Sequence, residues 1–418
     1  MQAISVSVAK DQLQLPAVRA TAVLGARQVP GNLYHPHRFT PLTGMATTLS
    51  LDLYPSSYAQ ARTRFLGAAR TAGAVLFSQV LPRIRGPENE ELALDAAYVG
   101  VPDAERVLVM LAGTHGSEGY AASPLLTAFL RESQQLARSY AGVGILLVHA
   151  VNPYGFAYTL RTNENNVDLN RNFIDFSALP PSNNSYRELH PLLLPADRST
   201  AGRAAARHAL AAWSAAHGQA AFFNAVFMGQ YDLPEGLMYG GREREWSNLA
   251  LEFVTRRFLR GTRRIAFIDW HTGLGEYGKP FFLCFNEVGS LQWERCCDWW
   301  GRDAVDTRSG FDGAPRPQYS GLVFHGMRRF CASADFSGAV IEFGTTPPDI
   351  TIEGLLDDNR LRFDDAAALD AHERGALLER AMASFCPSDQ DWRRRVLDTG
   401  LAISRQAFHG MCAQDPAL

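Results

Sequence analysis

A histidine and a glutamate stand three residues apart in residues 113–119, which read Gly-Thr-His-Gly-Ser-Glu-Gly. In a tight turn the imidazole of His115 and the carboxylate of Glu118 can point the same way and bind one cation. A helix beginning here offers an alternative, because Glu118 would interact favourably with the positive end of its dipole. The motif alone therefore leaves both a metal site and a helix cap open, since the chain has 11 histidines.

Two further candidates lie at the ends of short apolar runs. His271 directly follows residues 265–270, and Glu342 lies within residues 338–343. A carboxylate in so apolar a strand is expensive to bury unless a cation compensates its charge. The alternatives are a hydrogen-bonded core histidine at His271 and a buried salt bridge from an arginine to Glu342. In open α/β sheets ligands bind where parallel strands end, so His115, His271 and Glu342 are expected to lie together.

Two histidines and one glutamate are the ligands of a catalytic rather than a structural zinc site. His115, Glu118 and His271 would leave a tetrahedral zinc with one position open for water. The metal would lower the pKa of that water and polarise a substrate carbonyl. A nearby carboxylate is then needed as general base and later as general acid, and Glu342 fits that role. The sequence therefore predicts one zinc per chain.

A polar segment, residues 161–173, reads Arg-Thr-Asn-Glu-Asn-Asn-Val-Asp-Leu-Asn-Arg-Asn-Phe and is expected to form a loop. An arginine fork suits a carboxylate because it makes two parallel charge-assisted hydrogen bonds. The alternative is an asparagine-rich turn whose arginines face the solvent.

These motifs, in their order and approximate spacing, resemble the zinc carboxypeptidase superfamily of carboxypeptidase A-like metallopeptidases. The run 168–173 is the most specific part of the resemblance. Residues 229–231, 239–241 and 271–275 look like a bacterial branch known only as a domain of unknown function. More distantly, the chain is similar to the succinylglutamate desuccinylase and aspartoacylase group. The resemblance extends over roughly residues 50 to 400, and the sharp motifs cover a small part of it.

The resemblance implies a role for each matching residue. Zinc would be held by His115, Glu118 and His271, with Glu342 as general base and acid. Asp168 would orient His115 from behind, a support that metal-bound histidines commonly need.

For the substrate, the resemblance implies that Asn170 and Arg171 hold a terminal carboxylate. Arg161 would stabilise the oxyanion of the tetrahedral intermediate, although it lies closer to Asn170 than in the digestive enzymes. Tyr319 lies at a suitable distance before Glu342 to correspond to the family's mobile tyrosine, and an ordinary loop tyrosine is the alternative.

Strand-like and helix-like segments alternate along the chain, which predicts an α/β fold. We expect a mostly parallel or mixed twisted sheet with helices on both faces, similar to that of the zinc carboxypeptidases. The expected strands are residues 106–113, 143–150, 264–270 and 338–343. The expected helices are residues 57–72, 121–138, 201–217, 364–385 and 390–408.

The first 44 residues differ from the rest, with four prolines and little apolar periodicity. They are expected to be a disordered or targeting extension, or to precede a true start at Met45. Residues 45–418 are expected to form a single catalytic domain that ends in helices.

Composition excludes several classes of protein. A net charge of −3 offers no footprint for nucleic acid or an anionic membrane. No apolar run is long enough to span a membrane, and six irregularly spaced cysteines indicate reduced thiols. A cytoplasmic protein is therefore expected.

Three functions remain open. The first is a metallocarboxypeptidase, whose partner is a small peptide. The second is an N-acyl amino acid deacylase, which would use the same carboxylate anchor. The third is a zinc-binding module without catalysis, and Glu342 argues against it because a binding protein needs no carboxylate beside an open metal position. A serine hydrolase is disfavoured, since Ser117 lacks the Gly-x-Ser-x-Gly context. The oligomeric state is left open.

Overall fold

A computed structural model describes residues 51–305, 316–364 and 370–413. The predicted extension, residues 1–44, lies outside the described residues.

The centre of the fold is a sheet of seven strands in the order β1-β2-β4-β3-β5-β7-β6. The strands are β1 (Val75–Arg85), β2 (Glu91–Gly100), β3 (Arg106–Ala112), β4 (Val143–His149), β5 (Arg264–Tyr277), β6 (Pro280–Cys284) and β7 (Asp335–Gly344). The inner strands β4, β3, β5 and β7 run parallel, whereas β1, β2 and β6 pair antiparallel with their neighbours. The predicted α/β fold is thus confirmed, with a mixed sheet.

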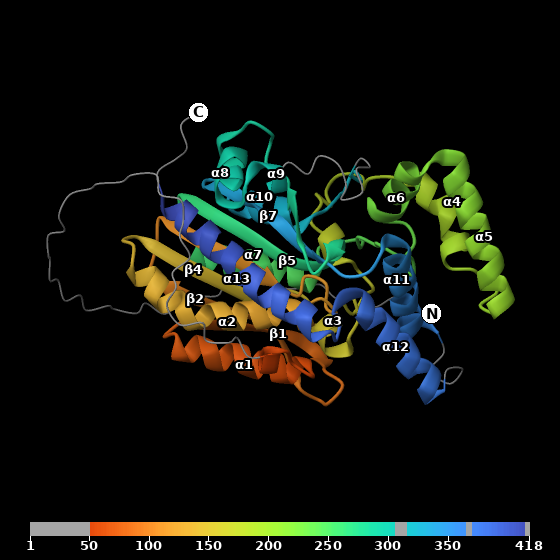
Figure 1. Cartoon of the computed structure of the whole chain (residues 1–418), viewed down its shortest axis with the longest axis horizontal. Coiled ribbons are helices and arrows are strands. Elements are labelled where there is room, and N and C mark those ends of the chain that lie inside the picture. Colours follow the sequence, from red (N-terminus) through yellow and green to blue (C-terminus); the bar gives the residue numbers. More distant parts are fainter. Residues whose placement is uncertain (1–50, 306–315, 365–369, 414–418) are drawn as a thin grey trace, which may run out of the picture. The chain divides into compact units, whose positions relative to one another are not determined.

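Helices cover both faces of this sheet (Figure 1). The helices α1 (Tyr58–Thr71), α2 (Gly119–Arg138), α8 (Leu291–Trp300) and α13 (Gln390–Cys412) share one hydrophobic cluster, and α7 (Trp246–Phe258) and α10 (Val323–Phe330) share another. The remaining helices are η1 (Leu51–Leu53), α3 (Pro153–Tyr158), η2 (Leu169–Arg171), α4 (Asn184–Leu193), α5 (Thr200–His217), α6 (Gln219–Phe227), α9 (Arg302–Val305), α11 (Pro348–Phe363) and α12 (Ala371–Phe385).

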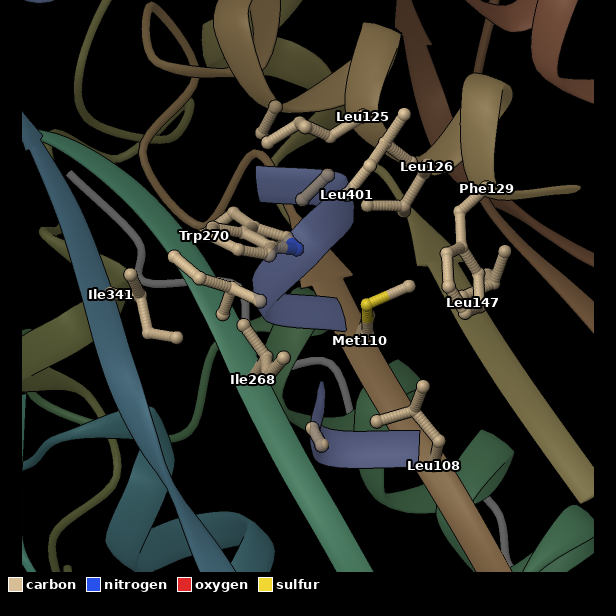
Figure 2. Close-up of a cluster of buried hydrophobic side chains, with 14 of the residues drawn as sticks. Leu108, Met110, Leu125, Leu126, Phe129, Leu147, Ile268, Trp270, Ile341 and Leu401 are labelled. Atoms are coloured by element: carbon tan, nitrogen blue, oxygen red, sulfur yellow. The ribbon is translucent and has the colours of Figure 1, made fainter. Parts of the chain in front are cut away.

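Strand β3 shows why the inner strands are apolar without interruption. Leu108 and Met110 pack under α2 and α13, whereas Val107 and Val109 point into the cluster on the opposite face. Figure 2 shows the first of these clusters, in which Trp270 of β5 lies close to Leu401 of α13. A strand buried on both faces has no polar side to alternate with.

Several predicted elements need correction. The expected strand 264–270 continues to Tyr277. The expected helix 364–385 is replaced by two helices, α11, which ends at Phe363, and α12, which begins at Ala371. Strands β1, β2 and β6 were not predicted from the sequence. Edge strand β1 lacks an apolar run because its side chains are mostly exposed or half-buried.

The parallel strands place the candidate residues at one edge of the sheet. β3 ends beside the middle of β5, where Leu111 pairs with Asp269, and His271 of β5 pairs in register with Glu342 of β7. The turn that carries His115 follows β3 directly. Among the described helices, none is both long and apolar enough to cross a membrane.

Candidate metal centre and substrate cavity

The turn between β3 and α2 presents His115 and Glu118 together. The backbone N–H groups of Gly116 and Ser117 donate to backbone carbonyls of the loop that contains Leu160 and Arg161. A side chain at Gly116 would collide with the backbone of Gly155, so this close approach requires glycine. Glu118 is the N-cap residue of helix α2, but its side chain makes no capping hydrogen bond. Its carboxylate is therefore turned away from the helix end and toward the imidazoles.

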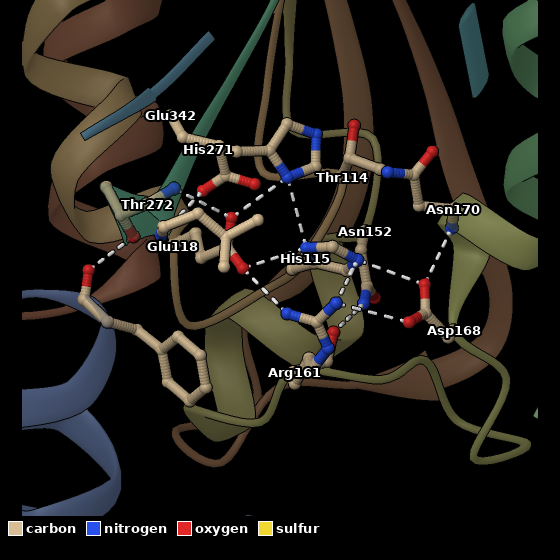
Figure 3. A network of polar contacts seen from close by, with 12 residues as sticks. Thr114, His115, Glu118, Asn152, Arg161, Asp168, Asn170, His271, Thr272 and Glu342 are labelled. Carbon is tan, nitrogen blue, oxygen red and sulfur yellow. Dashed lines mark hydrogen bonds and ion pairs between the residues drawn. The ribbon is translucent and has the colours of Figure 1, made fainter. Parts of the chain in front are cut away.

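The three predicted ligands form one buried cluster, drawn in Figure 3. Nδ1 of His115 lies 2.8 Å from Oε1 of Glu118 and 3.1 Å from Nδ1 of His271. Nδ1 of His271 lies 3.0 Å from Oε2 of Glu118. Ligand atoms about 2.0–2.1 Å from a tetrahedral zinc would be about 3.3 Å apart, so these separations fit a shared cation.

A carboxylate supports each imidazole on its far side. Nε2 of His115 lies 3.0 Å from Oδ1 of Asp168, as the resemblance implied. Nε2 of His271 lies 2.9 Å from Oδ2 of Asp269, which also accepts a hydrogen bond from the Thr114 hydroxyl. The hydrogen bond with Asp168 fixes the orientation of His115 and leaves Nδ1 free to bind a metal, and Asp269 places a negative charge beside Nε2 of His271.

Asp269 is a residue that the sequence interpretation missed. It lies two positions before His271 in residues 265–270, which are otherwise apolar, and its side chain is fully buried. The argument that singled out Glu342, a carboxylate in an apolar strand, applies equally to Asp269 and could have found it.

Charges in the cluster favour a cation. Although burial raises the pKa of Glu118, the neighbouring imidazoles of His115 and His271 hold it well below its usual value. Burial lowers the pKa of His271, but Asp269 and Glu118 raise it well above the usual range. In the protein alone, Asp269 and Glu118 thus favour a positive charge on His271, and a metal ion would supply positive charge at the same place.

Arg161 lies directly against this cluster. Its guanidinium Nη1 donates to Oε1 of Glu118 at 2.8 Å, and Nη2 donates to Oδ2 of Asp168 at 3.2 Å. Nη2 is also 2.8 Å from Nε2 of His115. A ring nitrogen that donates to Asp168 cannot accept from Arg161, so we regard the last contact as packing.

Glu342 is buried beside the cluster without a counter-ion. Among the described residues it forms no ion pair, and its nearest hydrogen-bond donor is the N–H of Leu274 at 3.4 Å. Among the described residues, Glu342 therefore does not form the buried salt bridge to an arginine that was the alternative. Burial, and next the charge of Glu118, raise the pKa of Glu342 to about 7. A carboxyl group with such a pKa can take up and release a proton near neutral pH.

Arg171 and Asn170 are buried in the polar loop rather than facing solvent. The Arg171 guanidinium donates to the backbone carbonyls of Phe227 and Asn170, and it stacks 5.2 Å from the ring centre of Tyr319. Among the described residues Arg171 has no carboxylate partner. The side-chain oxygen of Asn170 accepts a hydrogen bond from the backbone N–H of Val323, so the side-chain NH2 group of Asn170 points away from Val323.

One cavity of about 120 Å³ joins these parts. Six residues singled out in the sequence line it: His115, Arg161, Asn170, Arg171, Tyr319 and Glu342. Tyr319 lines this cavity, and burial raises its pKa to about 12. The candidate ligand His115, the carboxyl group of Glu342 and the guanidinium of Arg171 thus line the same space.

Comparisons with known proteins give one family match and several distant structural neighbours. Residues 54–399 match the family described as "Protein of unknown function (DUF2817)". A solved structure from Shewanella amazonensis, provisionally described as a metallopeptidase, is 17% identical, covers 79% of this chain and 94% of its own, and has a TM-score of 0.37. A metallo-carboxypeptidase from Burkholderia cenocepacia is 16% identical, with coverage of 81% and 68% and a TM-score of 0.36. Thrombin activatable fibrinolysis inhibitor is 13% identical, with coverage of 87% and 76% and a TM-score of 0.44. No curated protein matches significantly.

Proposed function

We propose that this chain, which belongs to the DUF2817 family of proteins of unknown function, is a zinc-dependent hydrolase that cleaves an amide bond next to a free carboxylate. One observation carries the proposal. A single cavity is lined by the candidate ligand His115, by the proton carrier Glu342 and by the buried guanidinium of Arg171.

The metal enters this proposal through the donor set. His115, Glu118 and His271 would hold one zinc per chain, with Asp168 and Asp269 supporting the imidazoles. A bound zinc ion would lower the pKa of a water molecule and polarise the carbonyl of the substrate.

Glu342 then moves the proton. It takes a proton from the attacking water and returns it to the leaving nitrogen, so that water adds across the amide and an amine departs. A pKa near 7 supports both halves of this role, because neither protonation state is strongly favoured.

The substrate's carboxylate would be held at the other side of the cavity. Arg171 has N–H groups directed at backbone carbonyls, and a ligand carboxylate would supply the negative charge that it lacks among the described residues. The amide of Asn170 would donate a further hydrogen bond. Arg161 would stabilise the oxyanion once a metal takes over the charge of Glu118.

Parallel substrate panels test the proposal. The zinc-loaded protein is offered N-acyl dipeptides with a free C-terminus and N-acyl amino acids, each beside the version with an amidated carboxylate. Release of the C-terminal residue is expected, with loss of activity on chelation and recovery with zinc. Cleavage of N-acyl amino acids alone would favour the deacylase, which uses the same anchor. Zinc binding without hydrolysis in either panel would leave a binding module and refute the proposed reaction.

A further inference from the structure

The backbone of Arg161 is held from two sides. Its carbonyl accepts a hydrogen bond at 3.0 Å from the N–H of Gly116, in the turn between β3 and α2. Its own N–H donates to Oδ1 of Asp358 on helix α11, at 2.8 Å. From this point the side chain reaches Glu118 and Asp168 with its guanidinium group. The place from which the guanidinium extends is therefore set both by the turn that carries the candidate ligands and by α11.

A second residue of α11 holds the same loop. Arg362 follows Asp358 by four positions, so both side chains lie on one face of the helix. Its guanidinium donates to the backbone carbonyls of residues 162, 163 and 164. It also lies 5.6 Å from the ring centre of Tyr154. Helix α11 thus contacts four consecutive residues of the loop, beginning at Arg161.

Asp358 is an expensive residue to bury at this place. Its carboxyl group is buried and forms no ion pair among the described residues. Burial raises its pKa from 3.8 to about 6, and the hydrogen bond from the N–H of Arg161 offsets only part of that rise. A buried polar group destabilises a fold unless hydrogen bonds compensate it. The neighbouring Asp357 differs, because Arg380 pairs with it at 2.7 Å.

The same helix forms part of the cavity wall. Thr351 and Leu355 of α11 line the cavity, and Leu355 precedes Asp358 by three positions. One helix therefore places an apolar wall and the loop that carries Arg161 relative to each other. Asp358 itself does not line the cavity, so any influence on a substrate would pass through Arg161.

We infer that Asp358 is a positioning residue, which fixes the backbone of Arg161 so that its guanidinium lies against the metal-ligand cluster. The inference rests on the proposed function, because the proposed reaction uses Arg161 to stabilise the oxyanion. Removing one such donor costs about a hundred- to a thousandfold in kcat, and a displacement of about 1 Å can cost about a hundredfold. Holding the backbone at Arg161 therefore has a kinetic consequence.

Hydrogen exchange tests the contact without any hydrolysis. In the zinc-loaded, full-length protein, Asp358→Leu removes the acceptor, whereas Asp358→Asn keeps an oxygen at the same place. Exchange of the Arg161 N–H, followed by mass spectrometry, should be about tenfold faster in the leucine variant and close to native in the asparagine variant. Asp358→Ala serves if the leucine variant does not fold. Asp357→Leu is the matched control, because it removes the adjacent buried carboxylate of α11, and it should leave this exchange rate unchanged.

Kinetics on an N-acyl dipeptide with a free C-terminus test the role in the reaction. Asp358→Leu should lower kcat at least about tenfold and change KM by less than about twofold, because the oxyanion forms only in the transition state. Asp358→Asn should restore kcat, and Asp357→Leu should not lower it. In an Arg161→Ala background, Asp358→Leu should lower kcat by no more than about twofold further, since the two residues act through one contact.

The outcomes distinguish the inference from the proposed function. Native exchange at Arg161 in Asp358→Leu, or an equal loss of kcat with and without Arg161, overturns the positioning role. A loss of kcat that Asp358→Asn does not restore also overturns it, because the asparagine keeps the acceptor. Faster exchange in Asp358→Leu alone, in a protein that hydrolyses no substrate, would support the contact that holds Arg161 and refute the proposed function instead.

Discussion

Replacing Glu342 by glutamine separates proton transfer from metal binding. The amide is nearly isosteric with the carboxylate, so the packing of β7 should change little. His115, Glu118 and His271 remain to bind zinc, and zinc content should therefore stay near one per chain. One positioned acid–base group contributes about a hundred- to ten-thousand-fold to a rate, so turnover should fall by at least the lower value. Substrate affinity should hold, because the loss lies in the transition state.

The same substitution should change how stability depends on pH. Burial raises the pKa of Glu342 from 4.5 to about 7, so the folded protein holds this proton more tightly than the unfolded chain. The resulting stabilisation is complete below pH 4.5 and is lost as the pH rises through 7. The shift corresponds to about 3 kcal/mol at pH 8. Glutamine cannot ionise, so the metal-free variant should not show this loss.

Three measurements test the role of Glu342. Elemental analysis gives the zinc content, urea unfolding at pH 5 and pH 8 gives the stability, and initial rates give kcat and KM. A folded, zinc-loaded Glu342→Gln protein with near-native turnover would refute the mechanism. A variant that is strongly destabilised at both pH values would show that Glu342 has a structural partner, and the reasoning from its burial would fail.

Four further predictions concern the surroundings of the cluster. His271→Ala should lose most of the zinc by elemental analysis, and a variant that kept it would contradict the ligand assignment. Asp269→Asn should weaken zinc affinity about tenfold to a hundredfold in a chelator competition, because the amide no longer fixes the proton of the imidazole. Arg171→Ala should raise KM about tenfold to a hundredfold for a substrate with a free carboxylate. It should change KM little for the amidated form, and equal effects on both would move the anchor elsewhere. Gly116→Ala should lower the free energy of unfolding by at least 1–3 kcal/mol in urea, since the methyl group meets the backbone of the neighbouring loop.

The sequence predicts the inner strands well and the outer ones poorly. Strands β3 and β4 are continuous apolar runs because both of their faces are covered, and their bounds differ from prediction by one residue. Strand β2 is also buried on both faces, but its central residues are mostly alanine, which has no preference for strands. Edge strand β1 has Leu81 as its one buried side chain and Pro82 beside it. Local pattern cannot reveal strands whose stability comes from pairing with distant neighbours.

The candidate site shows a similar division. His271 and Glu342 could be singled out because polar residues at the ends of apolar runs need an explanation, and the parallel sheet then brings them together. The position of Arg161 could not be predicted, because it depends on how its loop folds against the turn at Gly116. The cavity wall could not be predicted either, since Phe227 and Phe285 come from segments far apart in the sequence.

The charges of the site indicate what it binds. Three buried carboxylates, on Glu118, Asp168 and Asp269, surround two imidazoles, while Arg161 supplies one permanent positive charge. A divalent cation would provide the two charges that remain. Arg171 has the opposite need, because it is buried and has no carboxylate partner among the described residues. Burying the negative charge around the imidazoles, or the positive charge of Arg171, would be costly without a ligand of opposite charge. A metal cation at one end and a substrate carboxylate at the other end of one cavity would satisfy both, which is the arrangement that the proposed reaction requires.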